Sequence, residues 1–156
     1  MRVITFNCNG IRSAARKGFF NWLSSQDVDL ICLQETKAQA FQLEDPIFHP
    51  NGYYSHYFDA QKKGYAGTAL FSKQEPIKIS KGLGFEIADT EGRYIQADFE
   101  GLSVASLYLP SGSANEERQK RKILFMTEFM RFMQELKNKK KRLYRMCRLE
   151  YMPQGD

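Results

Sequence analysis

Asn7 and Glu35 each follow a short apolar run, and both side chains are of types that can hold a metal ion or a phosphate. A carboxylate such as Glu35 suits Mg²⁺, a hard cation that prefers oxygen ligands and keeps several of its waters. Asn7 offers an amide oxygen and an amide donor, so it can orient a metal-bound water, a carboxylate or a phosphate. Polar residues at the ends of buried strands are where α/β proteins build their sites, so the pair suggests metal-assisted chemistry.

Both residues also have ordinary structural explanations. Acidic side chains favour the first turn of a helix, which would explain Glu35 without any metal. Asn side chains often hydrogen-bond their own backbone in turns, which would explain Asn7. Taken together at two equivalent strand ends, the residues leave a metal site and a purely structural role equally open.

Tyr108 is a third candidate, because it ends an apolar run just before a turn that contains Pro110 and Gly112. From such a position its hydroxyl could donate to a phosphate oxygen. The alternative is an edge tyrosine that caps the core, which is the commoner use of this residue.

Arg12, Lys37, Gly67 and Arg93 are candidates for binding phosphate or DNA. Gly67 closes a loop whose backbone could approach a ligand closely. Arg93 follows a turn, where its guanidinium could meet a phosphate. Arg12 and Lys37 lie next to the two strand ends and could add positive charge there. Each of these residues can equally be ordinary loop chemistry.

The elements that must position these residues are short strands and two helices. Strands are expected at residues 2–7, 28–33, 53–58, 65–72, 93–99 and 102–109. A helix is expected over 13–25, and a long one over 115–137, where Phe125, Phe129, Phe132 and Leu136 recur at helical spacing. This order predicts a layered α/β domain in which helices cover packed sheets.

The composition bounds the class of protein. A chain of 156 residues is one domain by length, and its formal charge of +5 permits an anionic partner without demanding one. Much of that charge lies in residues 137–148. The three cysteines, Cys8, Cys32 and Cys147, show no metal-ligand spacing, which favours reduced thiols in a cytoplasmic protein. No stretch reads as a signal peptide or membrane span, so no membrane partner is expected.

The order of five motifs resembles the exonuclease III / abasic-site endonuclease family from residue 1 to about 141. They are Phe-Asn-Cys-Asn-Gly-Ile-Arg around Asn7, Leu-Gln-Glu-Thr-Lys around Glu35, Gly-Tyr-Ala-Gly ending at Gly67, Glu-Gly-Arg ending at Arg93, and Leu-Tyr-Leu-Pro-Ser-Gly around Tyr108. The resemblance implies a four-layer α/β sandwich of the deoxyribonuclease I type. It also implies a monomeric enzyme that hydrolyses phosphodiesters of double-stranded DNA, at abasic sites or from 3′ ends, with Mg²⁺ or Mn²⁺.

By that resemblance, Glu35 is a magnesium ligand, Asn7 is part of the metal site, and Tyr108 contacts the scissile phosphate. The family pattern continues with a Gly-Asp-x-Asn motif on the strand after the long helix, another acid, and a Ser-Asp-His motif. None of these is present in the chain. Where the apolar central strand is expected, three arginines interrupt the sequence.

A reading frame shifted by one base at residue 143 can encode Tyr-Ile-Val-Cys-Ala-Asp-Trp-Asn-Ile, which matches the missing strand. We therefore expect residues 1–141 to be the N-terminal part of the family domain. Residues 142–156 are expected to be a frameshifted tail that forms no central strand, because burying its arginines in a sheet would be costly.

A chain of this kind is expected to supply most of one sheet and two helices, and to be inactive as it stands. The apolar residues expected to be left partly uncovered are Val3, Ile4, Leu30, Leu33 and Leu107. Two other functions remain open. One is a non-enzymatic basic fragment that binds nucleic acid or a partner's complementary half. The other is a phosphoesterase acting on a phospholipid or inositol phosphate, because one fold hosts many activities.

Overall fold

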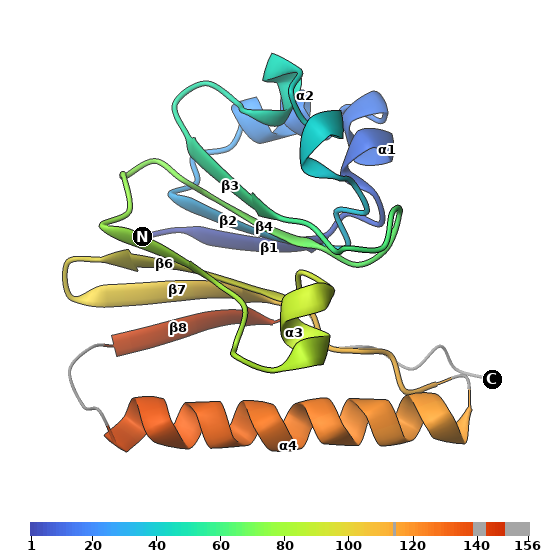
Figure 1. Cartoon of the computed structure of the whole chain (residues 1–156). Coiled ribbons are helices and arrows are strands. Elements are labelled where there is room, and N and C mark those ends of the chain that lie inside the picture. Colours follow the sequence, from blue (N-terminus) through green and yellow to red (C-terminus); the bar gives the residue numbers. More distant parts are fainter. Residues whose placement is uncertain (114, 139–142, 149–156) are drawn as a thin grey trace.

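Two four-stranded sheets pack face to face between helical layers, as the computed structural model shows (Figure 1). Sheet A has the strand order β1-β2-β4-β3, and sheet B has the order β5-β6-β7-β8. Helices α1 and α2 cover the outer face of sheet A, and α4 covers the outer face of sheet B (Figure 1). The structure describes residues 1–113, 115–138 and 143–148, the last of these by their backbone alone.

The strands of sheet A are β1 (Val3–Asn7), β2 (Leu30–Gln34), β3 (Tyr54–Phe58) and β4 (Thr68–Ser72). The strands of sheet B are β5 (Lys78–Lys81), β6 (Tyr94–Phe99), β7 (Leu102–Leu107) and β8 (Leu143–Arg148). The helices are α1 (Ile11–Arg16), α2 (Phe19–Ser24), α3 (Glu86–Thr90) and α4 (Glu116–Asn138), with short 3-10 turns at Ala40–Gln42 and Pro46–Phe48.

β2 lies in the middle of the molecule, and all five of its residues are buried. It pairs in parallel with β1 on one side and antiparallel with β4 on the other. Sheet B covers one of its faces and the α1–α2 layer covers the other. A strand buried on both faces needs a continuous apolar run, which explains the sequence Leu-Ile-Cys-Leu that leads to Glu35.

Five apolar residues were expected to be left partly uncovered, and for three of them this expectation is wrong. Leu30, Leu33 and Leu107 are 2%, 0% and 2% exposed. Leu30 packs between the two sheets, Leu33 packs beneath α1 and α2, and Leu107 packs against α4. The chain supplies both sheets, so their inner faces cover each other. Val3 and Ile4 on β1 are indeed only half-buried.

The long helix α4 forms as its periodicity predicts. Asn115 accepts a hydrogen bond from the backbone N–H of Arg118 at 2.8 Å and so caps the first turn. Phe125, Phe129 and Phe132 stack along one face, with 6.5 Å between the centres of successive rings. This face covers sheet B. None of the described helices, α4 included, is long and apolar enough to cross a membrane.

Several boundaries differ from those expected. The helix at 13–25 is two short helices that separate at Gly18, where φ is 89°. The strand expected at 65–72 begins only at Thr68, because Ala66 and Gly67 have positive φ angles that no strand accommodates. The short elements β5 and α3 were not foreseen, since neither carries a long apolar pattern.

The segment after α4 forms a strand, which the tail hypothesis did not foresee. β8 pairs in parallel with β7, with Leu102 opposite Leu143 and Leu107 opposite Arg148. It is one of the two outer strands among the described strands of sheet B, so it is not central there. An outermost strand needs hydrogen-bond partners on one side only, which makes charged sequences acceptable at this position. The rest of the expected tail, 149–156, lies outside the described residues.

Candidate active site

Asn7 and Glu35 meet at the ends of β1 and β2. The Asn7 Nδ2 atom donates to Glu35 Oε1 at 2.7 Å. The two strands are parallel and in register, and their pairing continues beyond the strands through the Cys8 N–H to the Gln34 oxygen and the Gly10 N–H to the Glu35 oxygen. The two side chains are therefore in contact at neighbouring strand ends, as the sequence predicts.

Tyr108 reaches the same mouth from sheet B, directly after the end of β7. Its hydroxyl donates a hydrogen bond to the Glu35 carboxylate. The backbone N–H of Tyr108 donates to the Arg93 oxygen at 2.8 Å, which extends the β6–β7 pairing by one step. Asn7, Glu35 and Tyr108, which lie far apart in the sequence, thus converge; we call the strand ends at which these three side chains meet the site mouth.

Buried Gln34 holds the two sheets in the register that makes this meeting possible. Its Nε2 atom donates to Ser106 Oγ on β7 at 3.0 Å and to Thr5 Oγ1 on β1 at 3.2 Å. Ser106 Oγ in turn donates to the Leu33 oxygen at 2.9 Å. Because polar atoms inside a core need such partners, these bonds fix the end of β7 beside the end of β2.

Lys37 adds positive charge next to the carboxylate. Its Nζ atom lies 3.1 Å from Glu35 Oε2 and donates to Asn9 Oδ1 at 2.5 Å. Arg12 is exposed at the rim, where Nη2 makes only a long contact of 3.5 Å with the Lys37 oxygen. Of the two cations expected here, Lys37 belongs to the site mouth, and Arg12 stands free to meet a ligand that extends beyond it.

The surroundings keep Glu35 ionised. Burial raises the pKa of its carboxyl, but the hydrogen bonds from Asn7, Tyr108 and Lys37 outweigh burial and hold the pKa below its usual 4.5. Burial and the bond to Glu35 raise the pKa of Tyr108, so its hydroxyl stays a donor. Burial also raises the pKa of the Cys8 thiol to about 12. Neither Tyr108 nor Cys8 is therefore ready to take a proton at neutral pH.

The backbone around the site mouth is unusual. Asn9, Glu35, Lys37 and Ala66 have φ angles of 43°, 54°, 49° and 44°, in the left-handed region that residues other than glycine rarely adopt. Hydrogen bonds hold these turns in place, among them the Lys37 N–H to the Ala66 oxygen at 2.9 Å. Strained backbone of this kind gathers at functional sites.

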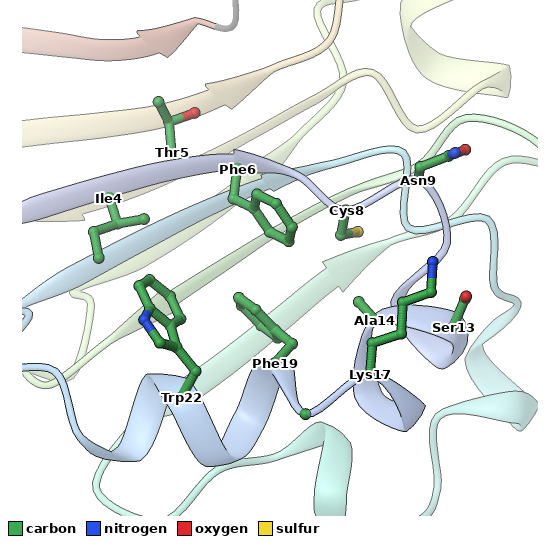
Figure 2. A pocket seen from close by; sticks show the side chains of 11 residues that line it. Ile4, Thr5, Phe6, Cys8, Asn9, Ser13, Ala14, Lys17, Phe19 and Trp22 are labelled. Carbon is green, nitrogen blue, oxygen red and sulfur yellow. The ribbon is translucent and has the colours of Figure 1, made fainter.

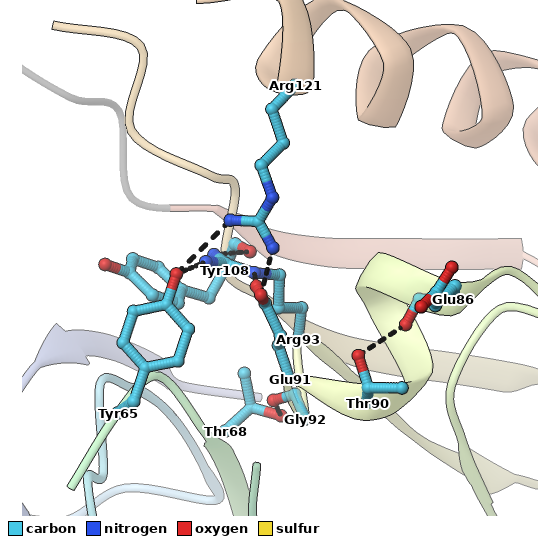
Figure 3. Close-up of polar contacts among 9 residues, drawn as sticks. All are labelled: Tyr65, Thr68, Glu86, Thr90, Glu91, Gly92, Arg93, Tyr108 and Arg121. Atoms are coloured by element: carbon cyan, nitrogen blue, oxygen red, sulfur yellow. Dashed lines mark hydrogen bonds and ion pairs between the residues drawn. The ribbon is translucent and has the colours of Figure 1, made fainter. Parts of the chain in front are cut away.

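Arg93 lies beneath Tyr108 and is placed differently from the phosphate contact expected from the sequence (Figure 3). The residue is 2% exposed. Its Nε atom pairs with Glu91 Oε2 at 2.5 Å, Nη1 donates to the Tyr108 oxygen at 3.1 Å, and Nη2 donates to the Tyr65 hydroxyl at 3.1 Å. With each nitrogen bound to a protein acceptor, Arg93 supports the site and does not face a ligand.

Arg121 extends this cluster to α4, as Figure 3 shows. Its Nη1 donates to the Tyr65 hydroxyl at 3.3 Å, and its Nη2 pairs with Glu91 Oε1. Glu91 and Tyr65 lie in two of the motifs quoted from the sequence, which assigned neither of them a role. The sequence argument missed Arg121 altogether. Arg121 gives no such signal, because its charge looks like part of a solvated helix face.

Gly67 also has a structural role, because its backbone binds to other residues that the structure describes. Its N–H donates to the Glu91 oxygen at 3.2 Å, and its own oxygen accepts from the Thr36 N–H at 3.2 Å. A Cβ atom here would lie 2.3 Å from Thr36 Oγ1. The close approach that requires glycine is therefore to Thr36, on the loop that carries Glu35.

The donor atoms at the site mouth fit a hard cation in part. Glu35 supplies an ionised carboxylate and Asn7 an amide oxygen, the ligand types that Mg²⁺ prefers. Within the described residues, no group of three or more His, Cys, Asp or Glu side chains could hold a metal. Magnesium sites often use one or two carboxylates and complete the shell with water and substrate phosphate, so the donors present correspond to part of such a site.

Residues 4–141 match the model of the Endonuclease/Exonuclease/phosphatase family. The chain belongs to this family. It is 40% identical over 141 residues to an exodeoxyribonuclease of Bacillus subtilis, a match that covers 90% of this chain and 55% of that protein. It is 34% identical over 117 residues to the DNA repair nuclease APEX1 of Danio rerio, covering 72% of this chain and 37% of that protein. The chain thus spans about half or less of these relatives.

Two solved structures share the fold of this chain. An AP endonuclease from Archaeoglobus fulgidus superposes with a TM-score of 0.74 at 32% identity, covering 85% of this chain and 51% of that one. A 3′-5′ exonuclease from Neisseria meningitidis, at 23% identity, shares the fold with a TM-score of 0.77, covering 88% and 53%. The four-layer α/β fold implied by the resemblance is confirmed.

Proposed function

We propose that this chain forms the N-terminal part of a nuclease that hydrolyses phosphodiesters of double-stranded DNA with Mg²⁺, or with Mn²⁺ in its place. One observation carries the proposal: Asn7, Glu35 and Tyr108 converge on a single mouth, from strands of two different sheets. The names of the relatives support the substrate class, since they include an exodeoxyribonuclease and AP endonucleases.

The described residues account for binding and charge stabilisation. Glu35 and Asn7 would hold the metal, which when bound would stabilise negative charge that develops on the phosphate. Asn7 keeps the Glu35 carboxylate aimed into the mouth, and Lys37 offsets its charge. Tyr108 keeps its proton, and with a substrate bound its hydroxyl would turn from the Glu35 carboxylate to donate to a phosphate oxygen.

A base for the attacking water is the part that these residues do not supply. Tyr108 and Cys8 are the nearest candidates, and both hold their protons at neutral pH. The match with this chain covers 55% of the Bacillus protein, so that relative is longer. We place the base in the part of the family fold that this chain does not match. A positioned base contributes roughly 10²–10⁴-fold in rate, so the proposal expects cleavage only from the longer protein.

A hybrid protein tests the assignment. Residues 1–141 would be joined to the part of the Bacillus exodeoxyribonuclease that this chain does not match, and cleavage of abasic and 3′-recessed duplexes would be measured with Mg²⁺. Glu35→Gln should lower kcat at least a hundredfold, whereas Glu44→Gln, which changes an exposed acid outside the mouth, should leave kcat unchanged.

Metal binding gives a second readout that needs no cleavage. Mn²⁺ titration of the hybrid, followed by electron paramagnetic resonance, should show a site that Glu35→Gln weakens and Glu44→Gln does not. Full activity in Glu35→Gln would overturn the assignment of Glu35, and equal hydrolysis of inositol phosphates and DNA would overturn the substrate class.

A further inference from the structure

Residues 90–92 lead from the end of α3 towards β6, and their backbone is bound to sheet A. Each of their three backbone oxygens accepts one hydrogen bond from the segment 61–68, which leads into β4. The donors are the N–H groups of Gln61 and Gly67 and the hydroxyl of Thr68, at 2.8, 3.2 and 2.9 Å. The turn that precedes a strand of sheet B is thus held by the other sheet.

The backbone of Glu91, in the middle of this turn, connects to the residues beside Glu35. The Glu91 oxygen accepts from the Gly67 N–H, and the Gly67 oxygen accepts from the Thr36 N–H, each at 3.2 Å. Only two hydrogen bonds therefore separate the Glu91 backbone from the residue that follows Glu35. Through these bonds, the position of Glu91 is tied to one side of the site mouth.

The side chain of Glu91 is tied to the opposite side of the site mouth, which Tyr108 forms (Figure 3). Glu91 Oε2 accepts from Arg93 Nε at 2.5 Å, and Arg93 Nη1 donates to the Tyr108 oxygen at 3.1 Å. Glu91 Oε1 accepts from Arg121 on α4. Because each carboxylate oxygen is bound to a different guanidinium, the Glu91 side chain is held in one orientation.

We infer that Glu91 is a positioning residue that couples the two sides of the site mouth. Its backbone oxygen holds the loop that packs against the Glu35 turn, and its side chain holds Tyr108 through Arg93. The hydrogen bond from the Tyr108 hydroxyl to the Glu35 carboxylate joins the two sides and depends on both connections. As a statement about catalysis the inference rests on the proposed function, whereas this hydrogen bond can be followed without metal or DNA.

A simpler role for Glu91 would be to neutralise buried Arg93, which is 2% exposed. Glu91→Asp separates the two roles. It keeps the negative charge beside Arg93, but its side chain is one methylene shorter and cannot span both guanidiniums. Neutralisation alone therefore predicts a variant that behaves like the parent chain, and positioning predicts one in which Tyr108 is displaced.

Fluorine NMR of the 156-residue chain, labelled with 3-fluorotyrosine, is the experiment. The chain has eight tyrosines, so the Tyr108 signal would be assigned with Tyr108→Phe. Glu35→Gln should shift this signal, because the hydroxyl loses its ionised acceptor. With Glu91→Asp in place, the shift caused by Glu35→Gln should fall at least about twofold, since coupled residues act non-additively.

Glu128→Asp is the matched control. Glu128 lies on α4 and pairs with Arg131 at 3.1 Å, without contact to the site mouth. With this variant in place, the shift caused by Glu35→Gln should keep its full size. An equally large shift in the Glu91→Asp background would overturn the coupling and leave Glu91 as a counter-charge only.

Trp22 reports whether each variant is folded. It is the only tryptophan of the chain and lies beside a cavity of about 610 Å³, which Ile4, Phe6 and Phe19 also line (Figure 2). None of the residues that connect Glu91 to the site mouth lines this cavity, so the fluorescence of Trp22 should be the same in every folded variant. If Glu91→Asp does not fold, Glu91→Gln replaces it, because an amide keeps the length but offers only one acceptor.

Cleavage by the hybrid protein gives the link to catalysis. Glu91→Asp should lower kcat about tenfold and leave KM nearly unchanged, because a displaced Tyr108 loses an interaction made in the transition state. In a hybrid that carries Tyr108→Phe, Glu91→Asp should cost little more. Equal losses with and without Tyr108→Phe would overturn the route through Tyr108. An inactive hybrid, together with the expected fluorine shifts, would overturn the proposed nuclease activity and leave the coupling intact.

Discussion

The guanidinium carbon of Arg93 lies 4.7 Å from the centre of the Tyr108 ring, and Nη1 of the same arginine donates to the Tyr108 main-chain oxygen at 3.1 Å. One buried cation thus holds the tyrosine both by its ring and by its backbone. Because Glu91 in turn pairs with Arg93 and with Arg121 of α4, the orientation of Tyr108 depends on a helix that does not itself reach the site mouth.

Replacing Arg93 should therefore be costly. Arg93→Met leaves the Glu91 carboxylate, which is 14% exposed, with Arg121 as its remaining ion-pair partner. Breaking a buried ion pair from one side typically costs about 3–5 kcal/mol of unfolding free energy. Urea unfolding followed by circular dichroism measures the loss.

Arg131→Met is the control for this substitution. Arg131 is 65% exposed and pairs with Glu128 at 3.1 Å on the surface of α4. Exposed pairs of this kind contribute about 0–1 kcal/mol. Equal losses from the two variants would show that the cluster around Arg93 adds nothing beyond an ordinary surface pair.

Acid should weaken the fold in part through Glu35. Burial alone would raise the pKa of Glu35, but its hydrogen bonds hold the pKa below 4.5 in the folded protein. A carboxyl with a depressed pKa stabilises the fold above its unfolded pKa, and this contribution is lost as pH falls through the folded value. The difference in unfolding free energy between the parent and Glu35→Gln should shrink as the pH is lowered from neutral to below 4.5. A difference that stays constant or grows on acidification would contradict the depressed pKa.

Gly92→Ala should destabilise the chain. The φ angle of Gly92 is 58°, and an added Cβ would lie 2.4 Å from the backbone oxygen of Phe58, which cannot turn away. Backbone strain of this type costs about 1–3 kcal/mol. Gly84→Ala is the control: its φ angle is 86°, but no atom lies within 4 Å of the added Cβ. Thermal unfolding of both variants separates the clash from the cost of the φ angle, and similar midpoints would mean that no clash exists at Gly92.

The 156-residue chain by itself should show no magnesium-dependent cleavage of abasic or nicked duplex DNA above background. Glu35 alone attracts a metal weakly and is assigned to that metal, while Tyr108 and Cys8 hold their protons at neutral pH and cannot take one from water. A gel assay with the covalent hybrid as positive control tests this. Robust cleavage by the 156-residue chain alone that disappears in Glu35→Ala would show that the remainder of the family fold is not needed.

The strand ends were predictable because their signal is local. A run of apolar residues that stops at Asn7 or Glu35 shows where a buried strand ends, and two such strands in parallel bring their ends together. Sheet B was harder to foresee, because β5 has no residue that is fully buried and β8 carries arginines. Edge strands lack the pattern that identifies central ones.

Arg93 shows why the ion-pair cluster beside the site could not be predicted from the sequence. A turn before an arginine looks like an exposed position, yet burial here is decided by partners at a distance. Tyr65 comes from the loop before β4 and Arg121 from α4, and nothing in the spacing of these residues indicates that they meet. Ion-pair clusters depend on tertiary packing, which composition and periodicity do not report.

The left-handed backbone at Asn9, Glu35 and Lys37 has a consequence for whatever enters the site mouth. Turns held in such conformations by cross-loop hydrogen bonds have lost their rotational freedom during folding. A ligand therefore meets donors and a carboxylate that are already aimed, and its binding is not weakened by the ordering of a loop. The site mouth therefore binds a ligand without first ordering these turns.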